Sequence, residues 1–236
     1  MTSGTSFRQL ILETEKALRS KKAKRHLPIE IFAPTNSDDI SLFLPKMLAD
    51  IAIFGAAEID NWSGKTPKVN IRQIDDIHVD GKPTSIISIT SVNKPFLYDS
   101  VISEVTAGGR QIYMSLHPII LWDEKGNLKL RNANNKEGDE LQVSHIQIVL
   151  PQFTKPEAAD FKSRIANVLK QVNNAVRDWR PMLSTIDKAI SDIENIPSKK
   201  DYKGRQEAIA YLEWLKDKNF TLLGMREYTY SSTAKV

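Results

Sequence analysis

Apolar residues recur along the chain with two different spacings, which predict both helices and strands. A spacing of three to four residues predicts a first helix over residues 6–25 and a second over residues 40–59. Pro45 removes one backbone donor, so we expect the second helix to begin near Ser41 or to bend at the proline. Residues 68–74 alternate apolar and polar side chains, which is typical of a half-buried strand.

The pattern is more regular after residue 85 and predicts a compact order of elements. These are a strand at 85–92, a helix from Pro95 ended by Gly108-Gly109, a strand at 111–122, a hairpin turn at 124–127, a return strand at 128–131, an exposed loop at 132–140, a strand at 143–150, a long helix that starts at a Thr154–Glu157 capping box and is broken or kinked at Pro181, a last helix near 209–215, and a closing strand at 220–230. This order approximates βαββαβ, a helix-covered antiparallel sheet of ferredoxin type. We therefore predict an α+β fold, with an N-terminal helical subdomain carrying one strand over residues 1–80 and the sheet domain over residues 81–236.

Composition and charge narrow the classes of protein. The 236 residues contain no cysteine, which rules out disulfides, zinc–thiolate sites and thiol nucleophiles and suits a reducing cytoplasm. Residues 1–8 carry no secretory signal, and no apolar stretch is long enough to span a membrane. The net charge is +4, and only residues 21–26 concentrate basic side chains. Such a run suits either a helix C-terminus or a nucleic-acid contact; no aromatic residue interleaves with it, which favours the helix end and no nucleic acid.

The search for catalytic motifs finds no complete active site. The sequence holds no glycine-rich nucleotide loop, no Gly-x-Ser-x-Gly elbow and no His-Glu-x-x-His. His78 lies within the acidic stretch 75–81, where a divalent ion is one interpretation and an ordinary turn the favoured one. His117 and His145 are interpreted as packed strand residues, although a spatial pairing with a serine stays open. The chain is therefore expected to be a cytosolic regulatory or assembly module without catalytic or metal-binding residues.

Three sets of motifs resemble one known family. Residues 95–101 (Pro-Phe-Leu-Tyr-Asp-Ser-Val), followed by Leu-His-Pro at 116–118, resemble the first ACT-like domain of the large NAD-specific glutamate dehydrogenases. Asp-Trp-Arg-Pro-Met at 178–182 is similar to that family's segment after the long helix. Tyr-Leu-Glu-Trp-Leu at 211–215 and the run at 219–228 resemble the family's signature that closes the region.

The resemblance implies that the chain is an N-terminal, ACT-type segment of a much longer cytoplasmic, oligomeric enzyme. The parent would oxidise L-glutamate with NAD to 2-oxoglutarate and ammonia, while this segment itself would hold no cofactor. Its partners would be the rest of the parent chain and the other subunits, without a membrane or nucleic acid. The alternative is a stand-alone amino-acid-sensing or scaffolding module.

ACT domains typically bind amino-acid effectors near the loop between their first strand and first helix. The resemblance places that loop at residues 91–96 and implies Asn93, Lys94 and Phe96 as effector-binding residues. Such modules commonly have glycine after the proline, where this chain has Phe96, so the ring could fill the site. In the other interpretation, Asn93 and Lys94 merely start a helix.

Overall fold

The structure is a computed structural model that describes residues 7–21, 26–122, 128–131, 141–196 and 202–228. Within these ranges the helices are α1 (Phe7–Ser20), α2 (Ser37–Ser41), α3 (Pro45–Asp60), α4 (Leu97–Ala107), α5 (Lys155–Glu194) and α6 (Tyr202–Trp214), with a 3₁₀ turn η1 (Ile29–Phe32) and a π-helical turn η2 (Leu215–Asn219). The strands are β1 (Lys68–Val79), β2 (Lys82–Val92), β3 (Met114–Leu116), β4 (Ile119–Trp122), β5 (Leu128–Leu130) and β6 (Leu141–Pro151). The chain forms two units, residues 1–170 and 171–236, and the boundary between them falls inside α5.

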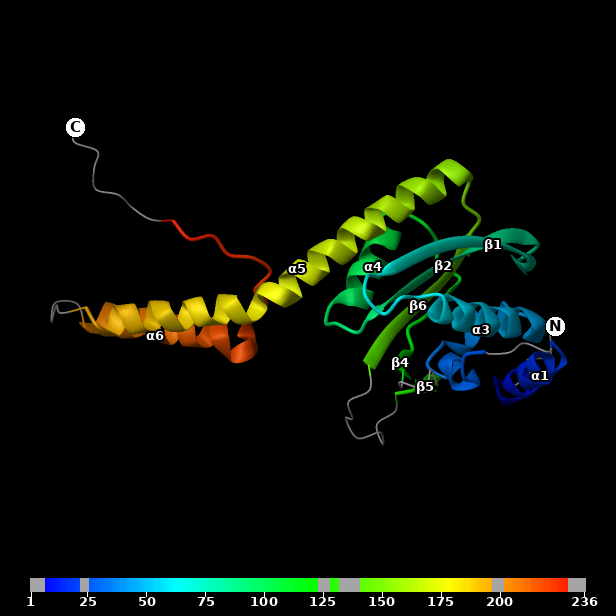
Figure 1. Ribbon diagram of the computed structural model, residues 1–236, viewed down its shortest axis with the longest axis horizontal. Coiled ribbons are helices and arrows are strands. Elements are labelled where there is room, and N and C mark those ends of the chain that lie inside the picture. Colours follow the sequence, from blue (N-terminus) through cyan, green and yellow to red (C-terminus); the bar gives the residue numbers. More distant parts are fainter. Residues whose placement is uncertain (1–6, 22–25, 123–127, 132–140, 197–201, 229–236) are drawn as a thin grey trace. The chain divides into compact units, whose positions relative to one another are not determined.

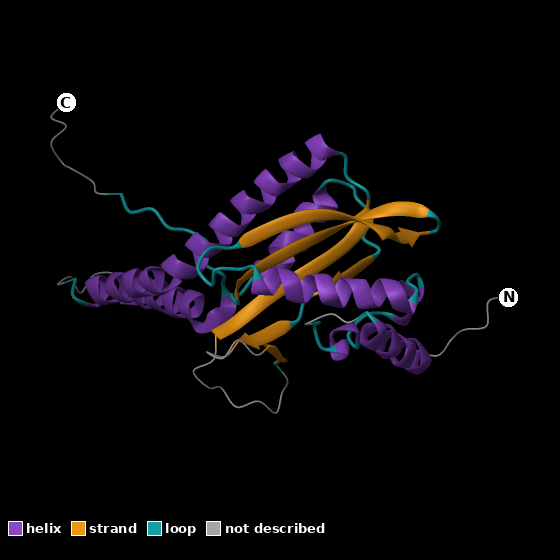
Figure 2. Ribbon diagram, turned by 45° about the vertical axis from the view of Figure 1, so that its right-hand side comes forward, coloured by secondary structure: helices purple, strands orange, loops and turns teal. Residues whose placement is uncertain are grey.

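One antiparallel sheet organises the first unit. Its order is β1-β2-β6-β4-β5, with β3 also paired to β6. Figures 1 and 2 show α3 against one face of this sheet and α4, with the first turns of α5, against the other. The predicted α+β class, with helices covering an antiparallel sheet, is thus confirmed.

The hairpin between β1 and β2 is tighter than the sequence pattern suggested. Asp80 and Gly81 have φ values of 51° and 73°, so both central residues of the turn are left-handed, as a type I′ turn requires. Val79 pairs with Lys82 directly across it. The acidic stretch from residue 75 was expected to be a turn, but its first five residues continue β1. The domain boundary predicted at residues 80 and 81 lies in this turn, between two strands that pair in one sheet.

Strand β1 lies beside β2, at the position in the sheet where the sequence pattern predicted the closing strand 220–230. β2 and β4, which are connected through α4, are separated in the sheet by β6, as in a split βαβ arrangement. A second split βαβ arrangement would start with β6 and α5. Its closing strand would then pair with β2, on the edge of β2 that faces away from β6. That position is filled by β1, which pairs with β2 over most of its length. Residues 220–228, where we predicted the closing strand, form no strand, and residues 229–230 lie outside the described residues.

Helix α3 packs unusually close to the sheet. A Cβ added at Gly55 would lie 2.5 Å from Leu27 Cδ1 and 2.8 Å from Gln147 Oε1, so any larger residue would force these two buried side chains to shift. Gln147 Nε2 donates to the carbonyl of Ile51 on the same helix at 3.1 Å. The main core lies on this side, where α1, η1 and α3 pack against Ile86, Met114, Leu116, Val143 and Val149 of the sheet.

Prolines divide the elements in ways that the pattern only partly predicted. Pro45 is the first residue of α3, and a separate short helix, α2, precedes it, so the expected helix over 40–59 is split. Pro118 separates β3 from β4 within the predicted single strand 111–122, and its carbonyl accepts from the His145 amide at 3.1 Å. Pro181 does not end α5, which continues through it to Glu194.

The start of α5 confirms the predicted capping box. The Thr154 amide donates to Glu157 Oε2 at 2.8 Å, and the Glu157 amide donates back to Thr154 Oγ1 at 3.4 Å. Arg110 also donates to Glu157, at 2.6 Å, while its guanidinium lies 4.1 Å from the ring centre of Phe153. The predicted turn at 124–127 and the loop at 132–140 lie outside the described residues.

Candidate effector pocket

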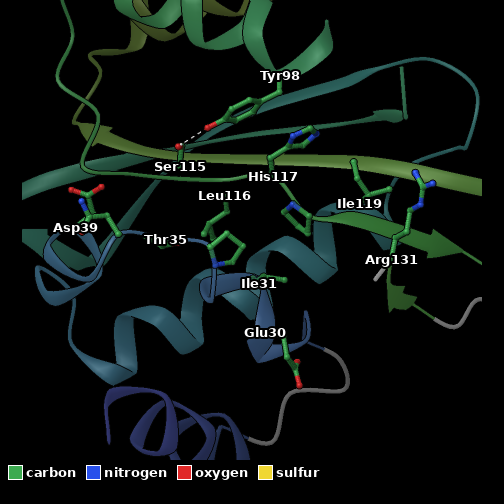
Figure 3. A pocket seen from close by; sticks show the side chains of 13 residues that line it. Glu30, Ile31, Thr35, Asp39, Tyr98, Ser115, Leu116, His117, Ile119 and Arg131 are labelled. Carbon is green, nitrogen blue, oxygen red and sulfur yellow. Dashed lines mark hydrogen bonds between the residues drawn. The ribbon is translucent and has the colours of Figure 1, made fainter. Parts of the chain in front are cut away.

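A pocket of about 500 Å³ opens at one edge of the sheet in the first unit (Figure 3). It is bounded by four parts of the chain: the η1–α2 connection, the junction of β3 and β4, Tyr98 of α4, and Arg131, which follows β5. The lining residues are Glu30, Ile31, Pro34, Thr35, Asn36, Asp39, Tyr98, Ser115, Leu116, His117, Pro118, Ile119 and Arg131. The break at Pro118 exposes the β3–β4 junction to the pocket.

An ordered set of aromatic and hydroxyl groups forms one wall. The Tyr98 ring stacks on His117 with centroids 4.7 Å apart and planes 5° apart. The Tyr98 hydroxyl and Ser115 Oγ are 2.8 Å apart and hydrogen-bonded (Figure 3). The stacking on Tyr98 of α4 thus holds the His117 ring in place. The Tyr98 and Ser115 hydroxyls make this wall of the pocket polar.

His117 also pairs with a serine, Ser144 of β6. Its Nε2 lies 2.7 Å from Ser144 Oγ, a pairing that the sequence left open. Burial lowers the pKa of His117, and the nearby Asp99 acts in the opposite sense, so the ring is mostly neutral at pH 7. Ser144 is fully buried at 0% exposure, so no substrate carbonyl can reach its hydroxyl. The pair therefore links the β3–β4 junction to β6 and is not a nucleophile with its base.

The pocket contains side chains of both charges. Glu30 and Asp39 come from the η1–α2 segment, and Arg131 comes from the end of β5. Figure 3 shows Asp39 and Arg131 at opposite ends of the pocket, with His117 between them. Arg131 Nη1 donates to Gln142 Oε1 at 2.9 Å, which positions the guanidinium at the mouth. An arginine and a carboxylate facing one cavity suit a small ligand that carries both a carboxylate and an ammonium group.

The predicted effector loop lies beside this pocket and does not line it. The Asn93 amide donates to the Gln142 carbonyl at 2.8 Å, and Asn93 Nδ2 reaches Gln142 Oε1 at 3.4 Å. Gln142 thus connects Asn93 to Arg131 of the pocket. Lys94 is half-buried, and Phe96 is 48% exposed with φ of 64°, the left-handed conformation that favours glycine.

Tyr98 and residues 116–118 were marked in the sequence only by the family motif, and the charged residues of the pocket carried no signal there. Asn36 and Asp39 resemble an ordinary helix start, and the Asn36 side chain does accept from the Asp38 amide at 3.1 Å. Arg131 is one basic residue beside a polar loop. Only the sheet, which brings the β3–β4 junction and β5 beside the η1–α2 segment, places these charges around one cavity.

A second polar cluster lies on the α3 face of the two central strands. Thr90 and His145 are direct partners across β2 and β6, with Thr90 Oγ1 and His145 Nδ1 2.9 Å apart, and Ser88 faces Gln147 in the same way. Burial, with a smaller contribution from His117, lowers the pKa of His145 to about 3. Ser88 Oγ, His145 Nε2 and Gln147 Oε1 are buried without a hydrogen-bond partner among the described residues. The imidazole is therefore neutral at physiological pH and serves packing.

Within the described ranges, no group of three or more His, Asp or Glu side chains gathers so that it could hold a metal ion. His78 lies exposed on β1. None of the helices within the described ranges combines the length and apolar character needed to cross a membrane.

The fold is that of an α+β, ACT-like domain, and comparison with known proteins identifies its family. Residues 29–165 match the family described as "Glutamate dehydrogenase, ACT1 domain". The chain therefore belongs to this family, which confirms the resemblance found in the motifs.

Two related enzymes extend the match. The chain is 29% identical over 177 residues to the NAD-specific glutamate dehydrogenase of Halomonas elongata, covering 72% of this chain and 11% of that enzyme. It is 27% identical over 153 residues to the NAD-specific glutamate dehydrogenase of Pseudomonas aeruginosa, covering 63% of this chain and 9% of that enzyme. The matched region thus spans about a tenth of the length of either relative.

Proposed function

We propose that these residues form a non-catalytic regulatory and assembly segment at the N-terminal end of an NAD-dependent glutamate dehydrogenase. The parent protein would act in the cytoplasm as an oligomer and convert L-glutamate, NAD and water to 2-oxoglutarate, ammonia and NADH. The family match to an ACT1 domain carries this proposal. The structure is consistent with it in one respect: Ser144, whose hydroxyl His117 contacts, is fully buried and out of reach of a substrate.

A spectrophotometric assay separates segment from enzyme. Residues 1–236 incubated with glutamate and NAD should form no NADH, whereas the full-length protein should form it. Turnover by the segment alone would overturn the non-catalytic assignment. A full-length protein that is inactive with glutamate and NAD would overturn the assignment of the parent reaction.

For the regulatory part, we place the effector site in the pocket between Asp39 and Arg131 and take an amino acid as the effector. The opposite charges of these side chains match the ammonium and carboxylate groups of such a ligand. Asn93 contributes through Gln142, which accepts from both Asn93 and Arg131. Lys94 and Phe96 shape the adjacent loop.

Calorimetry with a panel of amino acids tests the site. Arg131→Gln and Asp39→Asn should each weaken binding about tenfold or more, the loss of one charge-assisted contact. The matched controls are Arg8→Gln on α1 and Asp38→Asn, a carboxylate next to Asp39 that does not line the pocket. Binding that the controls weaken equally, or that no pocket variant changes, would place the effector elsewhere. Absence of binding to both the segment and the full-length enzyme would leave assembly as the role.

A further inference from the structure

The C-terminal part of the described chain contains an extended apolar segment without a place in the sheet. Residues 220–228 read Phe-Thr-Leu-Leu-Gly-Met-Arg-Glu-Tyr and follow η2 directly. Phe220 has φ of −137° and ψ of 141°, which are strand values. Four of the large side chains are strongly exposed: Phe220 at 55%, Leu223 at 68%, Met225 at 49% and Tyr228 at 83%.

The sequence of this segment is typical of a strand that is covered on both faces. In an extended chain, Phe220, Leu222 and Tyr228 would lie on one side and Leu223 and Met225 on the other. A strand with apolar residues on both sides normally packs between two layers. Leaving such a run in water is unfavourable, since each exposed apolar side chain forgoes its burial.

The sheet of the first unit has no position for this strand beside β2. In the split βαβ arrangement, the strand after α5 would pair with β2, but β1 already pairs with β2 there, from Lys68 opposite Thr90 to Val79 opposite Lys82, with a shift of register between Gln73 and His78. The other edge of β2 pairs with β6. The hairpin has thus displaced the closing strand from the position that the topology would give it.

We propose that residues 220–228 are a β-strand of a second sheet, which is supplied by the part of the dehydrogenase polypeptide that lies outside residues 1–236. This inference rests on the proposed function. Length supports the choice of partner: the matched region is 11% and 9% of the two related enzymes, so about nine-tenths of each lies outside it. The segment's backbone donors and acceptors supply the pairing, and the aromatic and aliphatic side chains supply the buried faces.

Hydrogen exchange measured by mass spectrometry tests the pairing on the full-length enzyme. The amides of 220–228 should exchange about 100-fold or more slowly in the full-length enzyme than in residues 1–236 alone. Equal exchange in both would overturn the inference. Protection of these amides in residues 1–236 alone, increasing with protein concentration, would also overturn it. The partner would then be a second copy of this segment.

Variants give an independent measurement. Leu223→Lys should lower the melting temperature of the full-length enzyme by several degrees and leave that of residues 1–236 unchanged, because Leu223 is exposed there. Leu223→Val, which keeps an apolar strand former, should restore most of the loss. Glu207→Lys, an exposed position on α6, is the matched control and should change neither protein. Equal effects of Leu223→Lys and Glu207→Lys would count against the strand.

Failure of this inference can be told apart from failure of the proposed function. If the full-length enzyme converts glutamate but the amides of 220–228 exchange freely, the strand inference is wrong and the proposed function stands. If the amides of 220–228 are protected in the full-length protein but it is inactive with glutamate and NAD, the proposed function is wrong and the strand inference stands.

Discussion

Phe96 offers a direct test of how the loop before α4 is built. It is the N-cap residue of α4 and adopts φ of 64° and ψ of −3°. A residue with a Cβ is strained in this left-handed conformation, whereas glycine is not. We therefore compare two truncations of the same ring, Phe96→Gly and Phe96→Ala, which lose the same packing and differ in backbone strain.

The expected magnitude follows from two opposing terms. The left-handed conformation costs a side-chain-bearing residue about 1–2 kcal/mol, which Phe96→Gly removes and Phe96→Ala keeps. Against this, glycine lowers the free energy of unfolding by about 0.5–1 kcal/mol relative to alanine, because it loses more conformational freedom on folding. The free energy of unfolding should therefore be higher for Phe96→Gly than for Phe96→Ala by about 0.5–1 kcal/mol.

Ser103 provides the matched control, because it is an exposed residue inside the same helix. There the order should reverse, with Ser103→Ala more stable than Ser103→Gly by about 1 kcal/mol. Urea unfolding followed by tryptophan fluorescence can measure all four variants, since Trp62 is 4% exposed and its emission changes on unfolding. If alanine is the more stable residue at both positions, the backbone of Phe96 is not strained and the argument is wrong.

Three further predictions follow from the buried contacts and the pocket. The pKa of His145 is about 3 in the folded chain against 6.5 unfolded, so the unfolded chain binds the extra proton and stability falls as the pH drops below 6.5. Urea unfolding should show that His145→Gln loses about 2 kcal/mol less than the wild type between pH 7 and pH 5; equal losses would refute a neutral buried ring. Gly55→Ala should lower the free energy of unfolding by about 1–3 kcal/mol despite alanine's better helix propensity, because its Cβ meets Leu27 and Gln147. Ala57→Gly on the exposed side of α3 is its comparison, and a more stable Gly55→Ala would show that α3 can shift. His117→Phe should keep the stacking on Tyr98 but lose the bond to Ser144, lowering the melting temperature by a few degrees in a thermal scan; an unchanged value would mean that the bond adds nothing.

The sequence predicted elements better than it predicted their partners. The capping box at Thr154 and the strand ending near Leu150 follow from local chemistry and are present, and the helix predicted from Pro95 is present but begins at Leu97, after the left-handed Phe96. Local signals do not say which strand lies beside which. The alternation at 68–74 marked a strand but not its place next to β2, and the apolar run at 220–230 suggested a closing strand whose position β1 occupies.

The candidate site was less accessible to sequence reasoning for a related reason. The resemblance pointed to the loop with Asn93, which lies one side chain away from the pocket, through Gln142. Asp39 and Arg131 face one cavity only because η1–α2 and the end of β5 meet at one edge of the sheet. Pro118 was visible as a proline in a strand, but the opening it creates between β3 and β4 depends on both pieces pairing with β6.

The place of β1 also bears on how the domain folds as it is synthesised. β1 and β2 are joined by a two-residue turn, so the ladder between them grows by closing very short loops, which is fast. All strands of the sheet have left the ribosome once Pro151 has emerged, before any residue of α6. A sheet closed by its C-terminal strand would keep an open edge while the 40 residues of α5 were made. Here β1 covers that edge of β2 as soon as the hairpin has emerged, and the free edge at this end of the sheet is β1 itself.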